Sequence, residues 1–170
     1  RNDTHLKTGL LFNNEFNLRV ISSSIDNKIG TDDESRISLF PQIASKISFP
    51  LIKNNVNFSQ TLTPILMPIL APYNNNTEAQ SISVSNIFSS NRATGLNQWE
   101  SGPRINYGLE WFLDLKKNID IKLTIGQAAK INKHKNDSSE EVSDYMISSR
   151  IILDSSKYID NTMILDRHDK

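Results

Sequence analysis

Histidines are the first residues to consider for chemistry, because imidazole serves both as a general base and as a metal ligand. The three in this chain, His5, His134 and His168, stand far apart, and none has a second histidine at metal-ligand spacing. The chain has no cysteine, and it contains no G-x-S-x-G elbow, P-loop or G-x-G-x-x-G turn. The sequence therefore predicts no catalytic residue, no metal site and no cofactor.

Charged residues at alternate positions point instead to binding by one face of a sheet. The segment 104–111 reads RINYGLEW, in which the odd positions are apolar and the even positions are polar or glycine. Side chains of a β-strand alternate between the two faces, so this strand is apolar on one side and wet on the other. Arg104 and Glu110 belong to the wet side.

Composition sets the outer limits on function. The chain has 170 residues, an apolar share of 37% and 19 basic against 19 acidic residues, so it lacks the positive footprint of a nucleic-acid-binding protein. Its longest apolar stretch, Pro64 to Pro72, carries three prolines and is too short for a membrane helix, which excludes a helical membrane protein. The N-terminus resembles no signal peptide, and we interpret the chain as an excised piece and not as an intracellular protein.

Eight strand candidates follow one another with connections that alternate in length. The candidate strands are Thr4–Phe12, Glu15–Ile25, Glu34–Phe49, Val56–Leu70, Gly102–Leu115, Ile119–Ile131, Glu141–Leu153 and Tyr158–Arg167. The short connections are Asn13-Asn14, 53–55, 116–118 and 154–157, whereas the others are long and polar. The sequence predicts an all-β, antiparallel up-and-down meander of about eight strands.

The alternation of short turns and long loops favours a transmembrane β-barrel. Outer-membrane barrels have short turns at one end, long loops at the other and strands of about ten residues. Aromatic residues support this reading, because Phe12 and Phe16 flank the first short turn, Phe49 and Phe58 the second, and Tyr158 follows the last. Two alternatives stay open: a small, self-contained eight-stranded barrel, and a soluble β-domain that acts as a binding or adhesion module.

The 102–131 hairpin has a predictable register. A three-residue loop at 116–118 pairs Leu109 with Ile125 and places Gly108 directly across from Gly126 on the wet face. Two facing glycines leave a gap that a plug or an inward-folded loop can approach. The Ser-, Asn- and Thr-rich loop from Ala71 to Ser101 is itself predicted to be solvated or in contact with a plug.

The run from Ser85 to Trp111, SNIFSSNRATGLNQWESGPRINYGLEW, resembles the barrel of the LptD lipopolysaccharide-assembly family, also called the organic-solvent-tolerance family. That family shows a pattern like LFxxNRxxGxDRxExGxRxxYGL here, followed by Gly-Gln on the next strand. The matching residues are Phe88, Asn91, Arg92, Gly95, Glu100, Gly102, Arg104, Tyr107, Gly108, Leu109, Gly126 and Gln127. The chain departs from the pattern at Asn97-Gln98, where the family has Asp-Arg, so that charge pair is missing.

The resemblance implies a non-enzymatic role in the outer membrane of a Gram-negative bacterium. The implied partners are lipopolysaccharide (LPS), an LptE-like lipoprotein plug in the lumen, outer-membrane lipid and, through an N-terminal domain missing here, the periplasmic Lpt bridge. Residues 1–170 would then form one central segment of a larger barrel, without the gate through which lipid leaves. The charged residues that we expect to face the lumen are Arg36, Lys46, Arg104, Glu110, Lys122 and Arg150. Asn91, Arg92 and Glu100 are the candidates for ordering the long loop.

Overall fold

The computed structural model describes residues 2–5, 9–25, 34–73, 82–93, 100–116, 119–131, 141–154 and 156–167, and the side chains of these residues except at 2–5, 23–25 and 34–36. The description of the fold below refers to this part of the chain. No helix in it is long and apolar enough to cross a membrane.

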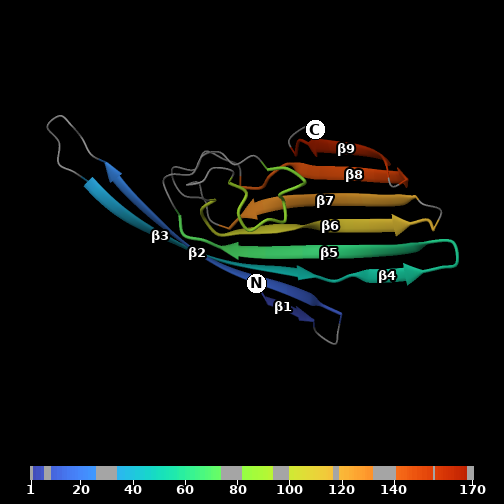
Figure 1. The fold of residues 1–170 in the computed structure, drawn as a ribbon, viewed down its shortest axis with the longest axis horizontal. Coiled ribbons are helices and arrows are strands. Elements are labelled where there is room, and N and C mark those ends of the chain that lie inside the picture. The colour runs from blue at the N-terminus through green and yellow to red at the C-terminus, as the bar shows by residue number, and fades with distance from the viewer. Residues whose placement is uncertain are drawn as a thin grey trace.

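All nine strands belong to one antiparallel sheet (Figure 1). They are β1 (Asn2–His5), β2 (Leu11–Ile25), β3 (Glu34–Ser48), β4 (Leu51–Asn54), β5 (Ser59–Leu70), β6 (Arg104–Asp114), β7 (Asp120–Lys130), β8 (Tyr145–Asp154) and β9 (Lys157–Leu165). Neighbours in sequence are neighbours in space, except that β3 and β4 both pair with β5, on either side of a break at Phe49 and Pro50. The sheet therefore has eight positions, and the predicted all-β meander of about eight strands is confirmed.

Strands β2 and β3 show the expected two-residue period clearly. On β2, Phe16, Leu18 and Val20 are 65%, 59% and 59% exposed, whereas the intervening residues are polar and partly covered. On β3, Ile37 and Leu39 are likewise 72% and 61% exposed. We call the face that carries these exposed apolar side chains the outer face, and the opposite one the inner face.

The register predicted for the β6–β7 hairpin is confirmed. Leu109 pairs with Ile125 and Gly108 with Gly126. The backbone N–H of Leu115 donates to the carbonyl of Ile119 at 3.0 Å, which closes the turn. Because the period is two, this register puts Leu109, Leu113, Ile121 and Ile125 on the outer face.

The predicted turn at Asn13 and Asn14 is wrong. Both residues lie inside β2, where they pair with Lys46 and Ser45 of β3, and β1 ends earlier, at His5. Asparagine is common in turns, but Asn13 continues the polar inner-face series of β2, and the Asn14 side chain accepts a hydrogen bond from Ser45 Oγ at 2.7 Å. Tertiary pairing therefore outweighs the local turn preference.

The expected aromatic girdle at the turn end is only partly present. Phe12 and Phe16 both lie inside β2, Phe12 as its second residue, and Phe49 lies at the break between β3 and β4. Tyr158 is next to the last turn, but the Arg150 guanidinium lies over its ring at 5.2 Å, which places it on the inner face. The second turn is also later than predicted, since Asn55 N–H donates to the Phe58 carbonyl.

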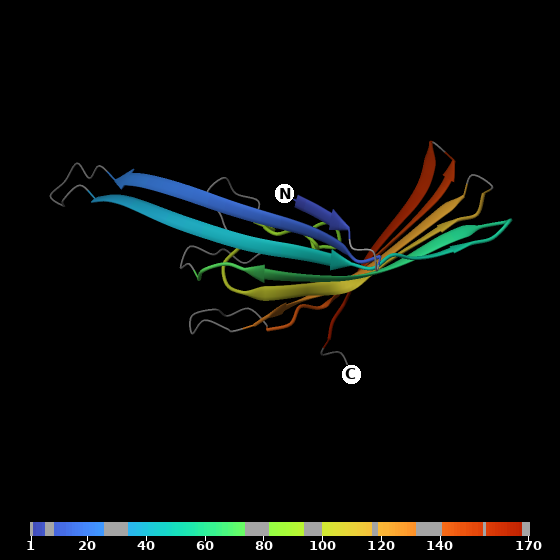
Figure 2. The same ribbon diagram turned by 90° about the horizontal axis from the view of Figure 1, so that it is seen from below.

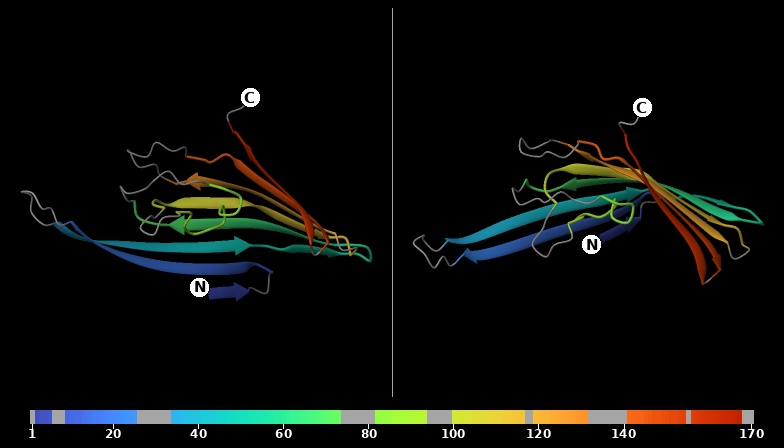
Figure 3. Two further views of the ribbon diagram at one scale, coloured as in Figure 1. Left: turned by 45° about the horizontal axis from the view of Figure 1, so that its top comes forward. Right: turned by 90° about the horizontal axis from the view of Figure 1, so that it is seen from above.

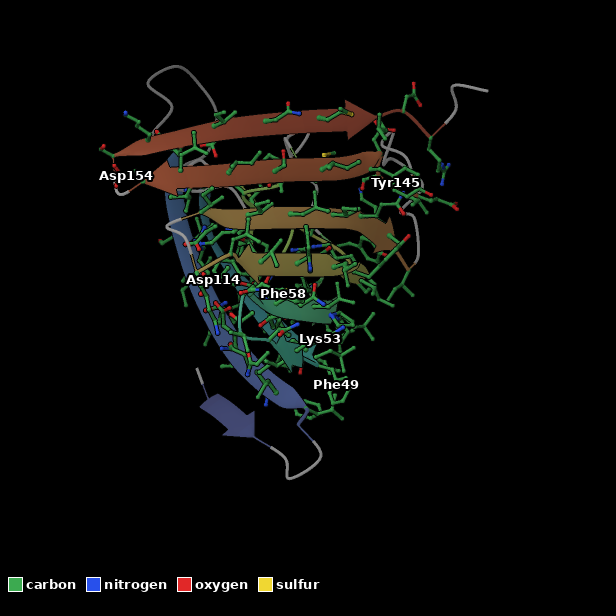
Figure 4. The ribbon with its side chains drawn as sticks, turned by 90° about the vertical axis from the view of Figure 1, so that its right-hand side faces the viewer. Phe49, Lys53, Phe58, Asp114, Tyr145 and Asp154 are labelled. Carbon is green, nitrogen blue, oxygen red and sulfur yellow. The ribbon has the colours of Figure 1, made fainter. Side chains whose placement is uncertain are left out.

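The two ends of the sheet differ. Figure 1 shows the ends of β4, β6 and β8 together at the right, with the end of β5, the end of β7 and the start of β8 at the left. Two of the turns touch, because Lys116 Nζ donates to the Asn55 carbonyl at 2.8 Å. Figure 4 views the sheet from the turn end. It shows Asp114 and Asp154, the last residues of β6 and β8, on the opposite side of the picture from Tyr145, the first residue of β8.

The sheet is strongly twisted, as expected for long antiparallel strands, and it is not flat in any view (Figures 2 and 3). The β2–β3 hairpin projects well beyond the loop end of the other strands. Residues 82–93, drawn in yellow-green, lie against the sheet between these strands and β6–β7 (Figures 2 and 3).

Candidate functional site

Strand β5 is apolar on both faces, and this determines where the β5–β6 connection lies. Its outer face carries Leu66 and Leu70, which are 46% and 57% exposed, whereas Ile65, Met67 and Ile69 on the inner face are at most 4% exposed. Apolar side chains on a wet face need a cover. The described part of the connection supplies it, because Phe88 packs on the cluster of Ala44, Met67 and Ile69.

The facing glycines of β6 and β7 receive the same segment. A Cβ built on Gly126 would lie 3.0 Å from Ile87 Cγ1, and one on Gly108 would lie 2.9 Å from the Phe88 ring. Ile87 is fully buried there. The gap predicted between the two glycines is thus occupied by the chain's own loop, which approaches where no side chain stands in the way.

A single backbone carbonyl joins this loop to strands on both sides of β5. The Ser90 carbonyl accepts a hydrogen bond from Gln42 Nε2 of β3 at 2.7 Å and another from Arg104 Nη2 of β6. Gln42 and Arg104 are each only 1% exposed. The loop therefore crosses the inner face as a bridge, fixed at residue 90.

Glu100 lies between two arginines and joins the end of the loop to Arg92, eight residues earlier. Its carboxylate accepts hydrogen bonds from Arg92 Nε at 2.8 Å and from Arg92 Nη2, and it lies 3.0 Å from Arg104 Nη2. The three side chains are between 1% and 5% exposed. The two-pronged geometry gives charge-assisted bonds of defined direction, and burial protects them from screening by salt.

Asn91 and Gly102 shape the backbone around this cluster. Asn91 Oδ1 accepts from the backbone N–H groups of Ala93 and Glu100 at 3.2 and 3.1 Å, so one side chain holds both sides of the loop. Gly102 has a φ of 84°, and a Cβ there would lie 2.7 Å from the Tyr73 ring. Only glycine fits this position without strain.

We name Arg92, Glu100 and Arg104 together the charge latch. Several of its atoms have no partner among the described residues, namely Arg92 Nη1 and Arg104 Nε and Nη1, and the same holds for the side chain of the neighbouring Asn106. The latch carries one negative and two positive charges, which leaves one net positive charge buried. Such a cluster is costly to disrupt, because removal of one member leaves a charge buried without compensation.

The described residues of the predicted loop are only partly solvated. Pro72, Tyr73 and Ser85 are exposed, whereas Ile87, Ser90, Arg92 and Glu100 are buried and the others are half-buried. The sequence contains a signal for an apolar cover over β5, because the run from Pro64 to Leu70 is apolar at odd and even positions alike. A strand with two apolar faces needs something apolar on each, and here the inner cover is Phe88.

Beside the loop, the inner face carries the charged residues that alternation predicted. Lys46 Nζ lies 5.2 Å from the Phe88 ring, and Glu110 and Lys122 line the same groove between the loop and β6–β9. Arg150 donates to Asp160 from Nε at 2.5 Å and from Nη2 at 2.8 Å. The groove is thus lined by both signs of charge and by hydroxyl groups such as that of Thr124.

Other residues of the motif lie elsewhere. Tyr107 and Gln127 are on the outer face, where Tyr107 Oη donates to Gln127 Oε1 at 2.9 Å and Gln127 Nε2 donates to the Ser143 carbonyl at 3.1 Å. Arg36 belongs to β3 opposite Ser23, but its side chain lies outside the described part, as does all of Gly95.

Sequence reasoning missed Gln42 and Asn106 as members of this site. Both lie at inner-face positions of their strands, where the sequence alone shows only ordinary polar residues facing a lumen. Gln42 is 48 positions from Ser90, and no local pattern reveals a contact over that separation. Among the described residues no group of three or more His, Asp or Glu side chains is placed to hold a metal ion.

The sheet thus has an apolar outer face, a charged inner face and a loop held on the inner face. No curated protein matches the chain. Residues 5–169 match the family model described as LPS transport system D, LptD. The chain therefore belongs to the LptD family, whose members take part in lipopolysaccharide transport and assembly in the Gram-negative outer membrane.

Proposed function

We propose that the chain is a wall segment of the outer-membrane β-barrel that inserts LPS into the outer leaflet. The observation that carries this proposal is the chemical difference between the two faces of the sheet. Large apolar side chains on the outer face stay exposed, whereas the inner face carries Lys46, Glu110, Lys122 and Arg150 beside the loop. This is the pattern of a strand between lipid and an aqueous lumen.

Lipid is the environment that the outer face fits best. Ile37, Leu39, Phe16, Leu18 and Val20 lie on the two paired strands β2 and β3 and are all more than half exposed. A soluble protein rarely leaves a contiguous apolar surface of this kind uncovered. In a bilayer the same side chains would contact lipid acyl chains and not water, so they need no protein partner.

The edges of the sheet support a larger barrel over a self-contained one. A closed eight-stranded barrel would pair its first and last strands, but in the described part of the chain the pairing ends at β1 on one side and at β9 on the other. Every residue of β9 is exposed. Backbone groups at the edge of a sheet require partners inside a membrane, so the proposal expects further strands to continue this sheet.

The inner face suits the polar part of LPS, which is rich in sugar hydroxyls and phosphate groups. Ammonium and guanidinium groups bind phosphate oxygens, and hydroxyl side chains such as Thr124 and Ser148 exchange hydrogen bonds with sugars. An LptE-like plug would share this lumen, and a periplasmic Lpt bridge would deliver LPS through a separate domain. The exit gate belongs to strands outside this segment.

Labelling in vesicles tests the two-faced wall directly. Single cysteines replace Ile125 on the outer face and Thr124 on the inner face of the intact protein, each carrying a fluorophore. The proposal expects brominated lipid to quench the label at position 125 and aqueous iodide to quench the label at position 124. Equal quenching by lipid at both positions would refute the wall. Depletion of the protein should also stop new LPS from reaching the cell surface.

A further inference from the structure

We propose that Arg92, Glu100 and Arg104 are positioning residues that hold residues 82–93 on the inner face as a permanent part of the wall. This segment then stays in place while LPS passes, and the passage runs beside it. The inference rests on the proposed function and adds which part of the lumen stays fixed.

The first argument is the number of independent attachments. Ser90 is bonded to both β3 and β6, Phe88 packs on the β3–β5 cluster, and Ile87 fills the space over Gly126. A segment that must leave the wall in each transport cycle would break all of these contacts at once. Mobile elements are instead drawn from regions with few buried contacts.

The second argument is the buried charge of the latch. Arg92 and Arg104 are 4% and 1% exposed, and Glu100 is their shared counter-ion at 4%. Lifting residues 82–93 would separate Arg92 from the buried Glu100 carboxylate, to which it donates two hydrogen bonds. The cost of separating buried partners greatly exceeds that of separating an exposed pair, so the latch favours a loop that is fixed.

The third argument is the groove that remains when the loop is in place. Residues 83–85 and 88–89 form one side of it, and inner-face residues of β6–β9, among them Lys122 and Arg150, form the other. The loop is therefore also a lining element of a polar surface. A path along this groove needs no movement of the loop.

A reversible disulfide can test whether the loop stays in place. A Cβ at position 126 would lie 3.0 and 3.3 Å from the two γ carbons of Ile87. Since a carbon–carbon bond adds only about 1.5 Å, the Cβ atoms of Ile87→Cys and Gly126→Cys fall within the ~4.5 Å reach of a disulfide. The chain has no cysteine of its own to compete.

The double variant is made in the intact protein, and LPS export to the cell surface is measured in its oxidised and reduced states. The expected result is that the disulfide forms and that the two states export LPS at rates within a factor of two. A larger loss on oxidation that dithiothreitol reverses would overturn the proposal, and so would two thiols that stay free under oxidant. Each single-cysteine variant is the control for the substitution itself.

The role of the latch has its own readout, the rate at which this disulfide forms. In the double-cysteine background, Glu100→Gln should slow disulfide formation by at least tenfold, because the loop spends less time against the wall. Asp160→Asn is the matched control, since Asp160 also pairs with an inner-face arginine but is exposed, and it should leave the rate unchanged. An unchanged rate in Glu100→Gln would overturn the latch.

A second attachment point covers the case in which the Ile87→Cys variant does not fold. Gln42→Cys and Ser90→Cys, bridged by a short bifunctional thiol reagent, fix the loop to β3 where Gln42 Nε2 now lies 2.7 Å from the Ser90 carbonyl. The same comparison of bridged and unbridged protein applies. Export that stops on bridging, in a protein whose outer face is quenched by lipid, would overturn the fixed loop and leave the proposed function intact.

Discussion

A buried charge at the middle of the outer face should destabilise the folded protein far more than the same charge one residue away. Ile125 and Thr124 are neighbours on β7 and face opposite sides of the sheet. We predict that Ile125→Arg is strongly destabilising in a bilayer and that Thr124→Arg is nearly neutral. The two variants lie on the same strand, at nearly the same depth, and introduce the same residue.

The magnitude follows from the position of Ile125 along its strand. Strand β7 has 11 residues, and Ile125 is the central one. Five residues at ~3.4 Å each, tilted by about 40°, put it roughly 13 Å from either edge of the ~25 Å apolar band. Arginine at that depth on a lipid-facing site costs about 2–4 kcal/mol, which is roughly a 30-fold to 900-fold change in the folding equilibrium.

Thr124 meets a different environment. It pairs with Glu110 on one side and with Ser148 on the other, so an arginine there stays hydrated and gains a nearby carboxylate. The expected change is within about 0.5 kcal/mol. Ile125→Met is the control for size, and its cost should stay below about 1.5 kcal/mol, because it keeps the volume and adds no charge.

The assay is urea-induced unfolding of the intact protein in lipid vesicles, followed by tryptophan fluorescence. The two arginine variants should separate clearly in their unfolding midpoints. Equal costs at both positions, or a larger cost at Thr124, would show that the faces are assigned wrongly. That result would also remove the main support for a wall between lipid and lumen.

Three further predictions concern the inner face. Gly108→Ala should prevent correct pairing of β6 and β7, because its Cβ would lie 2.1 Å from the Ile125 carbonyl oxygen, and loss of the folded band in gel electrophoresis would show it. Gly126→Ala should leave the sheet intact and displace only the loop, whose side-chain atoms are its nearest contacts, so that protease nicking of the loop increases. Glu100→Gln should cost about 3–5 kcal/mol in urea unfolding, since two buried arginines lose their counter-ion, whereas Asp160→Asn, at an exposed pair, should leave the midpoint unchanged. A stable Gly108→Ala variant, a loop equally resistant in Gly126→Ala, or equal midpoints for Glu100→Gln and Asp160→Asn would each contradict the packing described.

The sheet could be predicted from sequence because its determinants are local. Alternation of apolar and polar residues gives the faces, and the short turn at 116–118 fixes the β6–β7 register that the structure shows. The same local reasoning failed at Asn13 and Asn14, where two turn-forming residues continue a strand. Their pairing with β3 depends on residues more than thirty positions away, which local propensity does not report.

The inner site could be predicted only in outline. Facing glycines predicted that something approaches the sheet at Gly108 and Gly126, whereas the apolar run Pro64–Leu70, which could have indicated an apolar cover, served only to exclude a membrane helix. Neither signal identifies Phe88 as the side chain that fills the space or Gln42 as a partner of Ser90. Those contacts join segments that meet only after the sheet has curved.

The latch is buried on a face that otherwise meets water, and this position suggests why it is charged. An apolar cluster in place of Arg92, Glu100 and Arg104 would stabilise the folded protein with its loop docked more than the ions do, since replacing a buried ion pair by packed apolar groups is often stabilising. In the proposed barrel it would also leave an apolar surface in the lumen whenever the loop failed to dock, on the path that we propose for sugars and phosphates. Charged partners bind each other in one geometry and stay hydrated when apart, so they fix the loop in the folded wall without adding an apolar patch to the passage.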